Sequence, residues 1–106
     1  MTYKILGQIV PANATNTPLY EAPTGKQAVC STLTICNYGT YGCRFRVFVV
    51  GAVDSLTDKC NILYDVDINS NETLFFTIGI TLSAGDTVGV YVDNGTVAFN
   101  LFGTEV

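Results

Sequence analysis

The chain has 106 residues, enough for one domain with its own core and too few for a second. Hydrophobic residues make up 48% and charged residues 13% of it, whereas an average soluble domain has roughly 25% charged residues. The net charge is −4 and the five lysines and arginines are dispersed, which excludes a basic surface for binding nucleic acid. The sequence contains no run of about 18 apolar residues, so no transmembrane helix is predicted.

This shortage of charge predicts a permanent protein–protein contact. A small domain has much surface for its volume and cannot hide every apolar side chain inside itself. Obligate interfaces are apolar and poor in charge, so we expect an oligomer; the alternative is a monomer with a surface of Ser, Thr and Asn. Near the N-terminus, Gly7 and Gln8 interrupt the apolar stretch, so we expect no export signal and synthesis in a cytosol.

Apolar and polar residues alternate along most of the chain, and helical periodicity is absent, which predicts an all-β fold. Turn residues separate eight runs at roughly ten-residue intervals, a pattern typical of an antiparallel β-sandwich of jelly-roll type. We expect one sandwich domain over residues 1–106, with residues 1–10 as a first strand or an extended N-terminal arm. The predicted strands cover residues 2–10, 19–20, 27–37, 43–50, 60–68, 73–80, 87–93 and 96–102.

Two turns predict β-hairpins between consecutive strands. The segment from Cys36 to Cys43 is rich in Asn, Tyr and Gly and separates two β-type runs. Asn94-Gly95 lies between two alternating strands, which is typical of a type I′ hairpin.

The four cysteines predict disulfides. Their spacing, C-x5-C-x6-C-x16-C, contains no C-x2-C pair and the chain has no histidine, so a zinc site is not expected. Folding the first hairpin places Cys36 opposite Cys43, and the next connection brings Cys30 and Cys60 toward the other end, so we predict these two pairs; one disulfide with two buried thiols is the alternative. Strand alternation puts Cys36 on a polar face and Cys43 on an apolar one, so the first pair requires a bulge.

The sequence carries little that could support catalysis. Without histidine the commonest general base is missing, and no glycine-rich phosphate loop is present. Asp65 and Asp67 are expected on the solvent face of a strand whose Ile62, Tyr64, Val66 and Ile68 share the other face. We expect no enzyme activity, no metal and no cofactor.

Several short motifs follow one another in a recognisable order. They are Lys4-Ile5-Leu6-Gly7-Gln8, Leu19-Tyr20, Ile35-Cys36-Asn37, Leu63-Tyr64-Asp65, Asn71-Glu72-Thr73-Leu74-Phe75, Gly79-Ile80-Thr81-Leu82, Asp86-Thr87-Val88 and Phe99-Asn100-Leu101-Phe102-Gly103. This order resembles a family of small β-sandwich virion proteins of tailed bacteriophages, common among cyanophages. The resemblance spans nearly the whole chain but concerns fold motifs, not chemistry. Cys36 belongs to the family pattern, whereas the other three cysteines are additional, which implies a member hardened by disulfides.

The resemblance implies a structural role in the phage particle. The leading expectation is a capsid cement (decoration) protein, a homotrimer on the capsid exterior that clamps neighbouring major capsid protein subunits against the pressure of packaged DNA. The alternatives are a tail fibre or tail adaptor subunit and, from another class, a module that binds host carbohydrate through Tyr38, Tyr41 and Tyr91. The residues expected to contact a partner are Thr2, Tyr3, Lys4, Ile5, Tyr38, Tyr41, Arg44 and Arg46.

Overall fold

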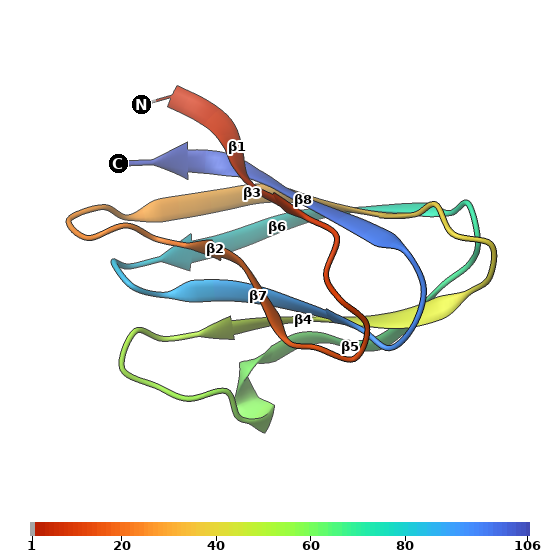
Figure 1. Cartoon of the computed structure of the whole chain (residues 1–106). Helices are drawn as coiled ribbons and strands as arrows, with labels where there is room; N and C mark the ends of the chain where they lie inside the picture. The colour runs from red at the N-terminus through yellow and green to blue at the C-terminus, as the bar shows by residue number, and fades with distance from the viewer. Residues whose placement is uncertain (1) are drawn as a thin grey trace.

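The computed structural model describes residues 2–106, which form two four-stranded antiparallel sheets packed face to face (Figure 1). The strands are β1 (Thr2–Ile9), β2 (Thr17–Glu21), β3 (Ala28–Asn37), β4 (Cys43–Val50), β5 (Asn61–Ile68), β6 (Thr73–Leu82), β7 (Thr87–Val92) and β8 (Val97–Glu105), and one 3-10 turn, η1 (Asp58–Cys60), precedes β5. The predicted all-β sandwich of eight strands is therefore confirmed. No helix within residues 2–106 is long and apolar enough to cross a membrane.

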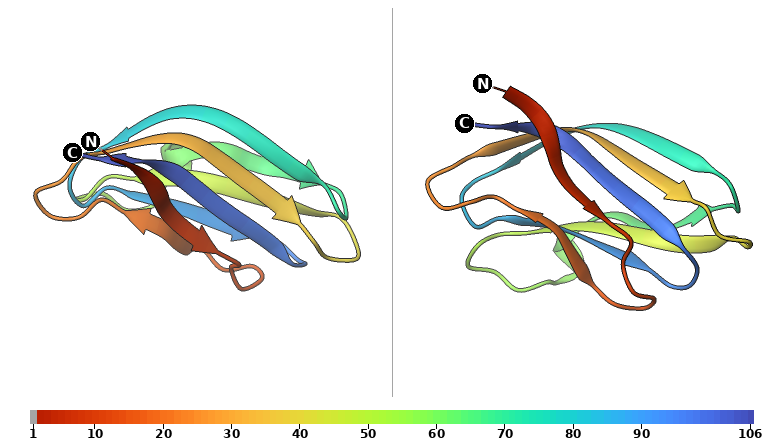
Figure 2. Two further views of the ribbon diagram at one scale, coloured as in Figure 1. Left: turned by 90° about the horizontal axis from the view of Figure 1, so that it is seen from above. Right: turned by 45° about the horizontal axis from the view of Figure 1, so that its top comes forward.

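The strand order is β1-β8-β3-β6 in one sheet and β2-β7-β4-β5 in the other. Successive strands therefore alternate between the sheets, except that β4 and β5 pair with each other, which is a jelly-roll topology. Figure 2 shows the chain crossing repeatedly between the two layers, and the start of β1 lies beside the end of β8. β1 is thus an integral strand of its sheet and not a projecting arm.

Both predicted hairpins are wrong. β3 pairs with β6 and β8, and β4 pairs with β5 and β7, so the segment after Cys36 crosses from one sheet to the other. The Asn94-Gly95 turn likewise connects β7 in one sheet to β8 in the other. A turn sequence specifies a reversal of direction, but burial of the apolar faces against each other decides whether the next strand joins the same sheet.

The core lies between the sheets and contains the inward side chains of both. The rings of Phe45 in β4 and Phe99 in β8 meet edge to face across the interface, with centroids 6.0 Å apart, and both side chains are fully buried. Leu33, Ile35 and Leu101 extend this core on one side. Burying each such side chain stabilises the fold by about 1.5–3 kcal/mol, so these residues hold the sheets together.

Bulges in β3 and β5 reverse the side-chain alternation of those strands. In β3 the register shifts at Ser31. As a result, Cys30 and Leu33 are both buried although they are three positions apart, and Val29 is exposed. In β5 the residues Tyr64 and Asp65 both lie opposite Arg46, and Asp65 has a φ of 50°. A bulge shifts the two-residue period by one position and moves the following side chains to the other face.

The β5 bulge corrects the predicted faces of that strand. The inward residues are Leu63, Val66 and Ile68, whereas Ile62 and Tyr64 are exposed on the outer face together with the carboxylates of Asp65 and Asp67. The expectation that Ile62, Tyr64, Val66 and Ile68 share one face is therefore wrong.

Candidate protein-binding surface

The outer faces of the two sheets differ in charge. Lys4 and Glu105 are the two charged residues on the described strands β1, β8, β3 and β6, and they form an ion pair of 2.5 Å with each other. The other sheet carries Glu21, Arg44, Arg46, Asp65 and Asp67 on its strands. One broad surface of the molecule is therefore without net charge.

We define the uncharged face as the outward side chains of β1, β8, β3 and β6, which the cross-strand register places in rows. One row runs Ile5, Phe102, Thr32 and Thr77, and the next runs Gln8, Asn100, Thr34 and Phe75. The remaining members are Tyr3, Val29, Cys36, Thr73, Thr81 and Ala98. The face is built of hydroxyl, amide, thiol and apolar groups.

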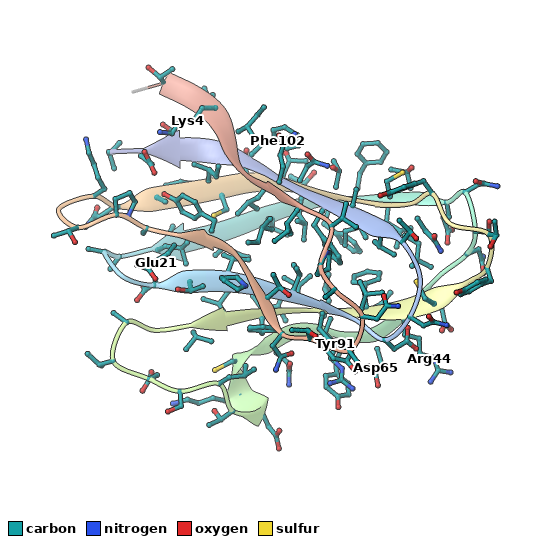
Figure 3. The ribbon with its side chains drawn as sticks, in the orientation of Figure 1. Lys4, Glu21, Arg44, Asp65, Tyr91 and Phe102 are labelled. Atoms are coloured by element: carbon teal, nitrogen blue, oxygen red, sulfur yellow. The ribbon has the colours of Figure 1, made fainter. Side chains whose placement is uncertain are left out.

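Large apolar side chains on this face are exposed to solvent. Tyr3 is 75% exposed, Ile5 53% and Phe75 72%. Tyr3 and Ile5 lie on β1, on the side of the molecule where Figure 3 labels Lys4 and Phe102, whereas Phe75 lies on β6 at the opposite edge of the sheet. A surface that exposes apolar side chains and carries no charge is typical of a protein–protein contact, because charged residues are depleted at the centre of interfaces.

Lys4 and Thr2, two of the predicted contact residues, are instead held by the fold itself. The Lys4 ammonium group donates to one oxygen of Glu105, and the hydroxyl of Tyr20 donates to the other at 2.5 Å. These hydrogen bonds, from Lys4 first and then Tyr20, keep the pKa of Glu105 below its usual value, while burial and the bond to Glu105 raise the pKa of Tyr20. The backbone carbonyl of Thr2 accepts a hydrogen bond of 2.8 Å from the hydroxyl of Thr104. These contacts connect β1 and β2 to β8, and leave Tyr3 and Ile5 projecting outward.

Tyr38 and Tyr41 lie at one end of the sandwich, in the loop that crosses between the sheets. Both rings are about half exposed, and the loop between them is held by Asn37, which is fully buried. The Asn37 amide donates to the carbonyls of Tyr41 (3.1 Å) and Ile68 (3.2 Å), and its oxygen accepts the N–H of Gly39 at 3.0 Å. This role of Asn37 was not predicted from the sequence, although a polar residue at the end of a buried apolar strand is a signal for one.

Arg44 and Arg46 lie on the outer face of the other sheet, where acidic residues of the same chain pair with them. Arg44 bonds to Asp67 at 3.0 Å and Arg46 to Asp65 at 2.6 Å. The Arg46 bond lowers the pKa of Asp65 and raises that of Arg46 itself. These two cations are neutralised within the chain, and the predicted contact residues therefore occupy three separate places.

The Arg46 guanidinium also stacks between two aromatic rings. Its central carbon is 4.3 Å from the ring centroid of Tyr64 and 4.5 Å from that of Tyr91. The β5 bulge at Asp65 creates this arrangement because it presents both Tyr64 and Asp65 to Arg46. One face of the Tyr91 ring is thus occupied by a cation, which leaves less of it for stacking on a sugar.

The predicted disulfides Cys36–Cys43 and Cys30–Cys60 are not formed, and all four thiols are free. Cys36 points outward from β3, whereas Cys43 points into the core from β4 in the other sheet, so the hairpin geometry behind the first pair does not exist. Cys30 is buried under β3, while Cys60 belongs to η1 and contacts Thr57 and Ser55. Burial raises the pKa of Cys30 to about 11 and also raises that of Cys43. The inferred hardening by disulfides is therefore wrong.

Among residues 2–106, no three His, Cys, Asp or Glu side chains come close enough together to hold a metal ion. Within the same residues, every buried side-chain nitrogen and oxygen atom has a hydrogen-bond partner. The interior therefore presents no unpaired polar group to a ligand, and the outer faces are the surfaces to consider for binding.

Comparison with protein-family models finds no match, and comparison with curated proteins finds none either. Among solved structures, the chain is similar to a pentameric capsid protein isolated from metagenomic phage sequences, at 14% identity and a TM-score of 0.36. The match covers 92% of this chain and 61% of that one, so the chain spans about three fifths of the length of that capsid protein. The similarity is confined to the course of the backbone, and no residue role carries over from it.

Proposed function

We propose that the chain is a capsid cement protein of a tailed bacteriophage, which binds the capsid exterior through its uncharged face. The observation that carries this proposal is the broad surface with exposed Tyr3, Ile5 and Phe75 and no unpaired charge, on a chain whose motifs resemble small phage virion proteins. The homotrimeric state and the major capsid protein as partner come from that resemblance.

The two faces fit a protein that lies flat on a shell. Burying the uncharged face removes apolar side chains from water at about 25 cal/mol per Å² and requires no charged group to lose its hydration. The opposite face, with the Arg44–Asp67 and Arg46–Asp65 pairs, stays hydrated and keeps the particle surface soluble. A protein that binds across neighbouring subunits only in the assembled shell shifts the equilibrium toward intact shells.

The copy number in purified particles tests the location. Mass spectrometry of virions should find this chain at a stoichiometry comparable with the major capsid protein. A few copies per particle would instead identify a tail fibre or adaptor subunit, and absence from the particle would refute a virion role.

Substitutions on the two faces test the binding surface. Tyr3→Asp and Ile5→Asp each place a carboxylate in the proposed contact, and each should weaken binding to undecorated shells at least about tenfold, or 1.4 kcal/mol. Asp67→Asn on the opposite face is the matched control and should bind as the unchanged protein does. Equal binding by all three variants would show that the uncharged face is not the contact.

A further inference from the structure

Each sheet of the sandwich has two edges, and three of the four described edge strands are protected against pairing. β2 has five residues and contains Pro18, which has no backbone N–H. β5 is interrupted by the bulge at Asp65 and carries a second carboxylate at Asp67. β1 has a bulge at Leu6 and the charged Lys4. Short length, proline, bulges and charge are the features by which edge strands avoid pairing with other chains.

β6 has neither the proline nor the charge, and with ten residues it is the longest of the four edge strands. Its one irregularity is a register shift against β3, where Ile78 and Gly79 lie opposite Ser31. The burial of its residues alternates regularly from Thr73 to Leu82. The strand pairs with β3 on one side only, so the backbone groups that point away from β3 have no strand partner. An edge of this length and composition is a template for another strand.

The core is also open along this edge. Leu74, Phe76, Ile78 and Ile80 point inward from β6 but are only partly buried, whereas Leu33 and Ile35 on the neighbouring β3 are buried completely. An additional strand beside β6 would therefore cover apolar side chains as well as satisfy backbone hydrogen bonds.

We propose that β6 pairs with β6 of a second copy, antiparallel about a two-fold axis that places Thr77 opposite Thr77. In this register Phe76 lies opposite the second copy's Ile78 and Leu74 opposite its Ile80, so apolar residues meet on the inward face. On the outer face Phe75 lies opposite the second copy's Gly79. A slip by one residue would set inward side chains against outward ones.

The pair of Phe75 and Gly79 favours this register. Phe75 is 72% exposed, and a Cβ built on Gly79 would have no atom within 4 Å, so the outer surface above the glycine is empty. An aromatic ring on the neighbouring strand covers the bare backbone of such a glycine. The two-fold axis forms this contact twice.

The self-complementary order of β6 favours a second copy as the occupant, because Phe75 of each chain would face the bare Gly79 of the other. β6 contains no charged residue, so two chains of net charge −4 can meet along it without opposing like charges in the contact. The nearest carboxylate, that of Glu72, accepts the N–H of Asn69 at 2.8 Å at the end of the strand. Pairing produces one eight-stranded sheet and doubles the uncharged face. The inference does not depend on the proposed function; in a homotrimer the same contact would join one trimer to the next.

Cysteine cross-linking tests the register. In a Cys36→Ser background, Thr77→Cys should form a covalent dimer on mild oxidation, because directly opposed residues lie within disulfide distance. Thr81→Cys, on the same face of the same strand, is the matched control: its two cysteines would lie eight residues apart, roughly 26 Å, and should not join. A mixture of Thr73→Cys and Thr81→Cys chains should cross-link to each other, since these positions are opposed in this register. Failure of Thr77→Cys to cross-link, or equal cross-linking of Thr81→Cys, would overturn the proposal.

Sedimentation gives an independent measurement. Thr77→Lys places two ammonium groups opposite each other at the two-fold axis and should halve the mass of the assembly, whether that assembly is a dimer or a pair of trimers. A mass that Thr77→Lys leaves unchanged would also overturn the proposal. Binding to capsid shells is measured separately, so loss of the β6 contact and loss of the proposed function can be told apart.

Discussion

Replacing Asn37 by alanine removes the side chain that connects the two sheets where the chain crosses between them. The amide of Asn37, at the end of β3, donates to the carbonyl of Ile68 at the end of β5 and to that of Tyr41 in the crossing loop. Its oxygen accepts the N–H of Gly39, and the side chain is fully buried.

The loss of stability in Asn37→Ala can be estimated from the number of hydrogen bonds that Asn37 makes. Three hydrogen bonds at about 1 kcal/mol each give a loss of about 3 kcal/mol, and the buried carbonyl of Ile68 is left without its donor. Small domains have a free energy of unfolding of about 5–15 kcal/mol, so this is a large share of the total. At about 4–8 °C per kcal/mol the Tm should fall by roughly 15 °C.

Urea unfolding followed by circular dichroism measures this loss. Asn100→Ala is the control, because Asn100 accepts one bond from Gln8 on the solvent side of the sheet and should cost less than about 0.5 kcal/mol. Asn37→Asp keeps the acceptor for Gly39 but sets a carboxylate against two carbonyls, so it should be as destabilising as Asn37→Ala at neutral pH and recover in acid. Equal stability of Asn37→Ala and Asn100→Ala would refute the role assigned to Asn37.

Two further predictions concern titratable groups. The pKa of Glu105 lies below its usual value of 4.5, so its carboxylate contributes stability that is present above that value and lost as the pH falls through the folded pKa. Urea unfolding from about pH 6 to about pH 3 should show this loss, and Glu105→Gln should have a flatter profile; an equally steep profile would contradict the ion pair with Lys4. For the cysteines, a thiol reagent should label Cys36 first in the folded protein and all four after unfolding, because Cys30, Cys43 and Cys60 are buried and burial raises the Cys30 pKa to about 11. Mass spectrometry should find no disulfide, and reductant should leave the Tm unchanged; fewer than four reactive thiols after unfolding would contradict the free cysteines.

The candidate surface could be predicted from the sequence only in part. Tyr3 and Ile5 were expected to contact a partner and project from the uncharged face, but Lys4 beside them pairs with Glu105, about a hundred positions along the chain. Arg44 and Arg46 were also expected to contact a partner, but they pair with Asp67 and Asp65, and this pairing depends on β5 lying beside β4. The sequence of a strand shows which charged side chains it carries. The residues that pair with those charges lie on another strand, and the sequence of the first strand does not show which strand that is.

The sequence by itself determined the all-β class and the positions of the eight strands, because alternating apolar residues and turn-forming residues act over a few neighbouring positions. Only the tertiary structure decided that β3 and β4 lie in different sheets, which separates Cys36 from Cys43, and that bulges at Ser31 and Asp65 reverse the faces of their strands. The physical reason is that sheet membership is set by which apolar faces bury one another over long sequence separations. One extra residue in a ladder is enough to turn the side chains that follow it to the opposite side.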